Sequence, residues 1–185
     1  LVVGDVNNSS TDNCTAQGSL IITLSKTIFN CADKGVNVVT MTVKDAAGNT
    51  ATCDATVTIA DAILPVVSAT ATTVTSNSNA DPGFCYYVVK GSEFDPSVTD
   101  NCSGTVLSYS VSGATTLSGT ATLAGQNLLP GANLITWTAS DGTNTSAPLA
   151  FTKTVIDNQA PIISSIGNQN RNTNSGCGYA VSGTE

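Results

Sequence analysis

The chain contains no histidine, one methionine and one tryptophan among its 185 residues, and only 10% of the residues are charged. Histidine is the side chain most often used for acid–base catalysis and metal binding near neutral pH, so its absence disfavours both. No apolar run approaches the roughly 18 residues that a membrane-spanning helix needs. The net charge of −7 disfavours nucleic acid and anionic membranes as partners. We therefore expect no enzyme, no nucleic-acid binding and no membrane insertion.

Two sequence patterns recur at nearly the same distance along the chain. The tetrapeptide Thr11–Cys14 (TDNC) returns 88 positions later as Thr99–Cys102. Residues 36–61 align without a gap with residues 132–157, at a constant offset of 96. Repeated patterns at a fixed spacing indicate a tandem array of one structural unit.

A third pattern has a similar period and allows the repeats to be delimited. Cys85, in the segment CYYV, is echoed 92 positions later by Cys177, in the segment CGYA. The three echoes predict a repeat of about 90 residues. We interpret residues 1–61 as the C-terminal part of one repeat, 62–157 as a complete repeat, and 158–185 as the start of a third.

Hydrophobic periodicity predicts short β-strands, and no segment has the sustained period of 3.6 residues that is typical of a helix. Val39 and Met41 alternate with threonines, and Ile135, Trp137 and Ala139 alternate in the same way one repeat later. Alternation with a period of two is typical of a strand with one buried face. Short strands separated by Gly, Asn, Asp and Pro, in units of about 90 residues, fit a seven-stranded sandwich. The predicted fold is all-β, with tandem immunoglobulin-like antiparallel β-sandwich domains.

Two residues of the complete repeat need separate interpretations. Trp137 lies on the inward face of a predicted central strand, so we expect it in the core, in preference to a sugar-stacking role. Lys153 stands where the preceding repeat has Val57, which breaks the alternation of the last strand. We expect a β-bulge there, or a lysine whose ammonium group reaches solvent.

The order of these motifs carries a family resemblance. The chain runs G-x-C-x-Y-x-V, then TDNC, then G-x-N-x-(I/V)-T-x-T-x-x-D, and then T-V-x-x-D followed by proline. This order resembles the HYR (hyalin repeat) family. The variant with Phe29–Asp33 (FNCAD) and Val43–Asn49 (VKDAAGN) is similar to repeats of giant surface adhesins of the Bacteroidetes, gliding adhesins among them. The resemblance implies an immunoglobulin-like fold, export from the cell, and a role in adhesion or as a spacer.

The six cysteines, without a Cys-x-x-Cys pair or any histidine, favour a disulfide framework over a zinc site and place the chain outside the cytosol. The family pattern has four cysteines per repeat, and the complete repeat lacks the first and the last of them. The joint loss implies that the missing two pair with each other. The resemblance therefore implies a Cys85–Cys102 disulfide, and leaves Cys14 to pair with Cys31. Free buried thiols are the alternative.

Acidic residues supply the candidate binding site. Asp100 and Asp141 lie in two predicted loops at the end of the sandwich that receives the preceding repeat, and Asp61 lies in the linker that arrives there. The next linker, Asp157–Pro161 (DNQAP), is similar to the calcium-binding linker of cadherins. Clustered carboxylate and amide oxygens suit Ca²⁺, which takes six to eight oxygen ligands. The alternative is that these residues only cap their own turns.

Two functions are compatible with these features. The first is a structural or adhesive repeat of a cell-surface or secreted filament, stabilised by disulfides and stiffened by calcium. Its partners would be neighbouring repeats of the same chain and a surface polysaccharide or another cell-surface ligand. The alternative is an accessory module of a secreted polysaccharide-processing enzyme. Many near-identical repeats in the full protein would favour the filament, and a neighbouring catalytic domain would favour the accessory module.

Overall fold

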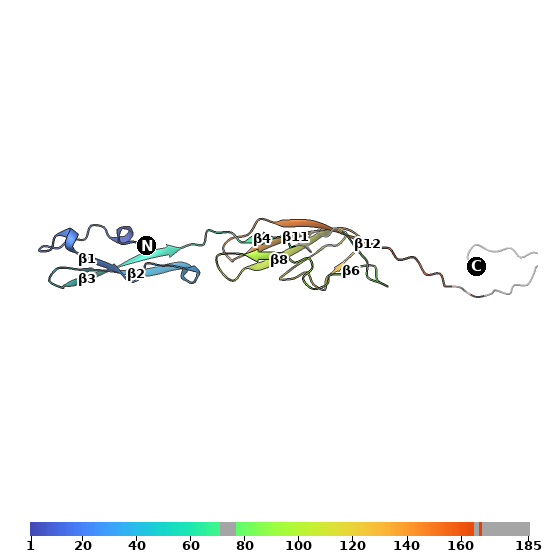
Figure 1. Cartoon of the computed structure of the whole chain (residues 1–185), viewed down its shortest axis with the longest axis horizontal. Helices are drawn as coiled ribbons and strands as arrows, with labels where there is room; N and C mark the ends of the chain where they lie inside the picture. The colour runs from blue at the N-terminus through green and yellow to red at the C-terminus, as the bar shows by residue number, and fades with distance from the viewer. Residues whose placement is uncertain (71–76, 165–166, 168–185) are drawn as a thin grey trace, which may run out of the picture.

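The computed structural model describes residues 1–70, 77–164 and 167, and in this part of the chain it is an all-β protein with a few short helical turns. Two β-rich bodies lie end to end along the long axis of the molecule and are joined by an extended segment after β3 (Figure 1). No helix in the described residues is long and apolar enough to cross a membrane.

The first body is a three-stranded antiparallel sheet in the order β1-β2-β3. Its elements are α1 (Val3–Val6), η1 (Gln17–Ser19), β1 (Ile21–Leu24), η2 (Cys31–Asp33), β2 (Gly35–Lys44) and β3 (Thr50–Ile59). A tight turn joins β2 to β3, and Gly48 has a positive φ of 96° there, a conformation that glycine adopts without strain. Val39 and Met41 are buried on one face of β2, as the alternation predicts.

The second body combines one five-stranded sheet with two small sheets. The large sheet has the order β5-β12-β11-β8-β9, and β10 pairs with β6 while β4 pairs with β7. All pairings in this body are antiparallel except that of β12 with β5. The strands are β4 (Val66–Ser68), β5 (Asn77–Asn79), β6 (Tyr87–Val88), β7 (Ser97–Thr99), β8 (Val106–Gly113), β9 (Leu117–Thr120), β10 (Asn127–Leu128), β11 (Gly131–Ser140) and β12 (Leu149–Ile156).

A single hydrophobic cluster fills this body, with contributions from both the large sheet and the small ones. Trp137 on β11 is fully buried, and its ring lies 5.2 Å from that of Tyr109 on β8. Leu128 on β10 packs in the same cluster. The prediction that Trp137 belongs to the core is confirmed.

The structure contradicts both interpretations of Lys153, the β-bulge and the lysine that reaches solvent. Residues on either side of it stay in regular register with β11, so the strand has no bulge there. The side chain is only 2% exposed, so it does not reach solvent. Its ammonium group lies 4.8 Å from the ring centroid of Phe94, and burial lowers the pKa of Lys153. A cation–π contact thus helps to accommodate a charge that the sequence pattern would place outside.

Two loops of the second body face the first body and position the candidate site. One follows β7 and carries Asp100, and the other follows β11 and carries Asp141. Most of the predicted third repeat, 158–185, including Cys177, lies outside the described residues.

Candidate functional site

The segment that follows β3 meets both loops of the second body. Asn144 donates from its side-chain amide to the backbone carbonyls of Asp61 and Ile63, each at 3.1 Å. Asn101 donates to the Asp61 carboxylate at 3.2 Å. The two asparagines therefore hold the connecting segment against the end of the second body and fix the direction in which the Asp61 side chain points.

The three aspartates predicted to bind calcium converge at this point. One carboxylate oxygen from each of Asp61, Asp100 and Asp141 lies within 4.8 Å of the others. Asp61 and Asp141 are each 8% exposed, and Asp100 is partly buried. The linker and the two distant loops therefore meet at this point, as the sequence predicts. Binding of an ion here stays a prediction.

Each carboxylate is oriented by hydrogen bonds from its own loop. The Asp141 carboxylate accepts bonds from the backbone N–H groups of Thr143 and Asn144, at 2.6 and 2.5 Å. Asp100 Oδ2 accepts a bond from the N–H of Cys102 at 3.1 Å, and Asp61 Oδ1 accepts one from Ile63 at 3.2 Å. The structure therefore shows turn capping, the alternative that the sequence left open. Capping uses only some of the carboxylate oxygens.

The remaining oxygens make this cluster suitable for a cation. Asp61 Oδ2 and Asp100 Oδ1 are buried and accept no hydrogen bond. A buried carboxylate oxygen without a donor is costly, because it has lost its water without a replacement. Oxygen donors from carboxylates are the ligands that Ca²⁺ prefers. The residues present thus fit a hard divalent cation held by Asp61, Asp100 and Asp141.

Lys34 is a member of the site that the sequence did not reveal. Its ammonium nitrogen lies 3.8 Å from Asp61 Oδ2, which is too long for a hydrogen bond but close enough for electrostatic attraction. Hydrogen bonds from Asn144, aided by this positive charge, lower the pKa of Asp141 to about 2. Both effects favour the ionised form of Asp141. Lys34 reaches Asp61 because the antiparallel pairing of Gly35 with Ile59 places the residue before β2 beside the segment that follows β3.

The disulfide at the junction corrects both predicted pairings. Cys31, in η2 of the first body, is bonded to Cys102 in the second body, with an S–S distance of 2.03 Å. Cys14 and Cys85 are exposed free thiols, so neither the Cys85–Cys102 nor the Cys14–Cys31 bridge is present. The reason is geometric. Cys85 lies at the far end of the second body, beside the segment that leaves it, whereas Cys102 lies at the end that faces the first body.

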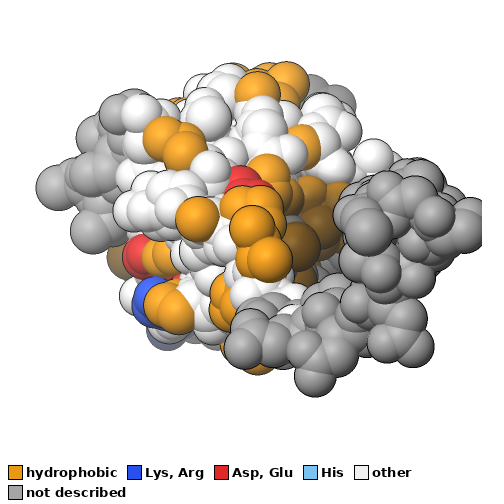
Figure 2. Space-filling view, turned by 90° about the vertical axis from the view of Figure 1, so that its right-hand side faces the viewer, with side chains coloured by type: hydrophobic (Ala, Val, Ile, Leu, Met, Phe, Trp, Pro, Cys, Tyr) orange, Lys and Arg blue, Asp and Glu red, His pale blue; other side chains and the backbone are white. Residues whose placement is uncertain are grey.

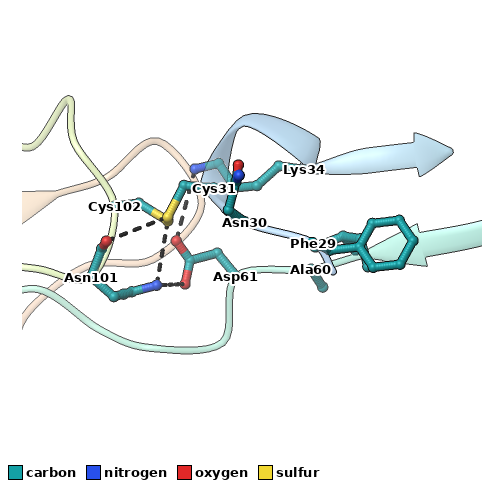
Figure 3. A pocket seen from close by; sticks show the side chains of 9 residues that line it. Phe29, Asn30, Cys31, Lys34, Ala60, Asp61, Asn101 and Cys102 are labelled. Atoms are coloured by element: carbon teal, nitrogen blue, oxygen red, sulfur yellow. Dashed lines mark hydrogen bonds and ion pairs between the residues drawn. A yellow bond between two sulfur atoms is a disulfide. The ribbon is translucent and has the colours of Figure 1, made fainter. Parts of the chain in front are cut away.

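The two cysteines of the disulfide and Asp61 border one hollow of about 210 Å³. Figure 3 shows Asp61 between Asn101 and Lys34, with Cys31 and Cys102 beside them. Phe29 and Ala60 from the first body line the same hollow. Covalent, ionic and hydrogen-bonded contacts between the two bodies are thus concentrated in one small region.

No family model matches the chain, and no curated protein matches it.

Proposed function

We propose that this chain is a segment of a long cell-surface or secreted adhesin, in which tandem immunoglobulin-like sandwich repeats form an adhesive or spacing filament. The observation that carries the proposal is the junction, where a disulfide joins two bodies placed end to end and three carboxylates converge. Such a connection resists bending, which matters when a structure must hold its ends apart. Neighbouring repeats of the same chain are the main partners, with a surface polysaccharide as the external ligand class.

An extracellular location is part of the proposal. Disulfides persist mainly in oxidising surroundings and are rare in the cytosol. The Cys31–Cys102 bond encloses a sequence separation of 71 residues and joins two separate bodies, so its loss would free one body from the other at this point. The proposal therefore requires a compartment in which this bond stays oxidised.

Calcium is the proposed ligand of the acidic cluster. The ion would be bound by Asp61, Asp100 and Asp141, and would satisfy the two buried oxygens that accept no hydrogen bond. Each of these residues comes from a different segment, so one ion would tie the linker to both loops. Its role is to fix the angle between the two bodies.

Calcium titration of matched variants tests this assignment. Asp61→Asn removes one charge and keeps the side-chain shape, so we expect the calorimetric signal of the junction site to be lost. Asp54→Asn is the control, because Asp54 is exposed on β3 and bonded to Thr40. Small-angle scattering of the same proteins should show a narrower range of interbody angles with calcium than with EDTA, except in Asp61→Asn.

Equal calcium binding by both variants would refute the assignment of the ion to this cluster. An unchanged scattering profile on chelation of the unsubstituted protein would refute the stiffening role. In the first case the carboxylates would act as turn caps only.

A further inference from the structure

The Cys31–Cys102 disulfide and the acidic cluster of Asp61, Asp100 and Asp141 lie at the same junction. Each half of the disulfide belongs to a segment that carries or contacts one of the carboxylates. We infer that this disulfide regulates the acidic cluster, so that oxidation of the two cysteines raises its affinity for a divalent cation. This regulation rests on the calcium site of the proposed function and adds a condition under which that site binds its ion.

Asp100 is oriented by the residue that carries one half of the disulfide. Its Oδ2 atom accepts a hydrogen bond from the backbone N–H of Cys102 at 3.1 Å, and Cys102 is only 6% exposed. The disulfide holds Cys102 against the first body, so it also holds the turn in which Asp100 Oδ1 is buried and accepts no hydrogen bond. Opening the bond removes a restraint on this turn.

Asn101 connects the sulfur atoms to the Asp61 carboxylate. Its side-chain amide donates to Asp61 Oδ1 at 3.2 Å and lies 3.3 Å from Cys102 Sγ. Its backbone carbonyl oxygen lies 3.4 Å from Cys31 Sγ (Figure 3). The residue that orients Asp61 is thus in contact with both cysteines, and a displacement of the sulfur atoms also displaces a hydrogen bond of the cluster.

The other half of the disulfide lies beside the positive charge of the site. Cys31 begins η2, and the backbone N–H of Lys34 donates to the carbonyl of Cys31 at 3.4 Å. The Lys34 ammonium nitrogen lies 3.8 Å from Asp61 Oδ2. The disulfide therefore holds both this charge and the linker carboxylate opposite the loops of the second body.

Repulsion between the carboxylates makes this restraint important for cation binding. One oxygen from each aspartate lies within 4.8 Å of the others, so without an ion Asp61 is repelled by Asp100 and Asp141. The disulfide keeps the two bodies together against this repulsion, and an ion then finds its ligands already in place. After reduction, the ion must also draw the bodies together. Because Asn144 still holds the linker, we expect about a tenfold loss of affinity, within the range of roughly 5–150-fold that is typical of coupled sites.

The coupling is reciprocal, so the cation should stabilise the disulfide against reduction by the same factor. For a tenfold effect the reduction potential shifts by about 30 mV. Reduced glutathione is the reductant, and its thiolate attacks Sγ of Cys31, which is partly exposed, so that the buried Cys102 leaves as a thiolate. A second glutathione thiolate then releases Cys31. One protein disulfide and two reduced glutathiones thus give two protein thiols and one glutathione disulfide.

Calcium calorimetry on full-length proteins measures one side of this coupling. The double variant Cys31→Ala and Cys102→Ala should bind calcium about tenfold more weakly than the oxidised unsubstituted protein. Cys85→Ala is the control and should leave the affinity unchanged, because Cys85 is an exposed free thiol at the opposite end of the second body. Figure 2, which looks onto that end, shows only scattered Asp and Glu side chains on its visible part.

The redox equilibrium of the unsubstituted protein measures the other side and needs no variant. The protein is equilibrated in glutathione buffers of graded potential, with saturating calcium or with EDTA, and trapped by alkylation. Peptide mapping then gives the fraction of Cys31–Cys102 bonds, which calcium should make about tenfold harder to reduce. The glutathione adduct of Cys85 is the internal control and should be the same in both buffers, because this thiol lies away from the junction.

Equal calcium affinity with and without the disulfide, or a redox equilibrium that does not change with calcium, would overturn the regulation and leave the calcium site intact. No calcium binding by the unsubstituted protein would instead refute the cation assignment of the proposed function, and the regulation with it. Emission of the buried Trp137 checks that the second body is folded in each variant. If the double variant is unfolded, the redox equilibrium decides alone.

Discussion

Removing the disulfide between the two bodies should destabilise the second body strongly. The perturbation is the double variant Cys31→Ala and Cys102→Ala, which leaves no new unpaired thiol at the junction. Cys102 is nearly buried and Cys31 is partly exposed, so alanine fits both positions without introducing a polar group. Cys85→Ala is the control, because Cys85 is an exposed free thiol.

The magnitude follows from the length of chain that the bond closes. With a separation of 71 residues, the chain-entropy relation gives a stabilisation of about 4 kcal/mol. If the first body stays folded while the second unfolds, the flexible loop runs only from the linker at Asp61 to Cys102. The value remains about 4 kcal/mol, because the entropy depends on the logarithm of loop length. The expected loss therefore does not depend on the order in which the bodies unfold.

Urea denaturation followed by tryptophan fluorescence measures this loss. Trp137 is the only tryptophan in the chain and is fully buried in the second body, so its emission reports on that body alone. Cys85→Ala should shift the free energy of unfolding by less than about 0.5 kcal/mol, as is usual for a surface change. A loss below about 1 kcal/mol in the double variant, far short of the chain-entropy value, would refute the reasoning.

Three further predictions concern the second body and its attachment. Burial and the Glu93 carboxylate raise the pKa of Tyr87 from 10.0 to about 12. The contribution of Tyr87 to the free energy of unfolding should therefore be full below pH 10 and fall as the pH rises towards 12. In urea titrations across that range, Tyr87→Phe should abolish this loss. Gly119→Ala should cost about 1–3 kcal/mol in thermal unfolding, because the new methyl group would overlap the side chain of Tyr109; an unchanged melting temperature would exclude that overlap. Asn144→Ala removes both hydrogen bonds to the linker carbonyls, so it should speed proteolysis of the linker while leaving Trp137 fluorescence unchanged. Equal cleavage rates in the variant and the unsubstituted protein would show that these bonds do not restrain the linker.

The strands could be predicted from a rule that acts along the chain, and the carboxylate cluster from the expected fold. Alternation with a period of two places Val39, Met41 and Trp137 on buried faces whatever the neighbouring body does. The convergence of Asp100 and Asp141 was predicted from the expected immunoglobulin-like sandwich, in which their two loops share one end of the domain. The loops follow β7 and β11, which belong to different sheets, so this prediction depended on the expected packing of the sheets.

The disulfide could not be predicted because it depends on contacts between bodies. The family resemblance implied pairing within one repeat, whereas Cys31 and Cys102 belong to different bodies and meet only after these pack end to end. The environment of Lys153 was predicted wrongly for a related reason. The alternation places this lysine on an inward face, but the ring of Phe94 that contacts its ammonium group comes from a distant loop.

The junction combines three kinds of contact, and their different geometries explain why one alone would not stiffen it. The Cys31–Cys102 bond fixes one point of contact and leaves the bodies able to rotate about it. The bonds from Asn144 to the linker add a second attachment on another loop. The carboxylates of Asp61, Asp100 and Asp141 form a third, but without a cation their like charges oppose close approach. In the proposed function, calcium would therefore change the angular freedom of the bodies, while the disulfide keeps them connected whether or not the ion is bound.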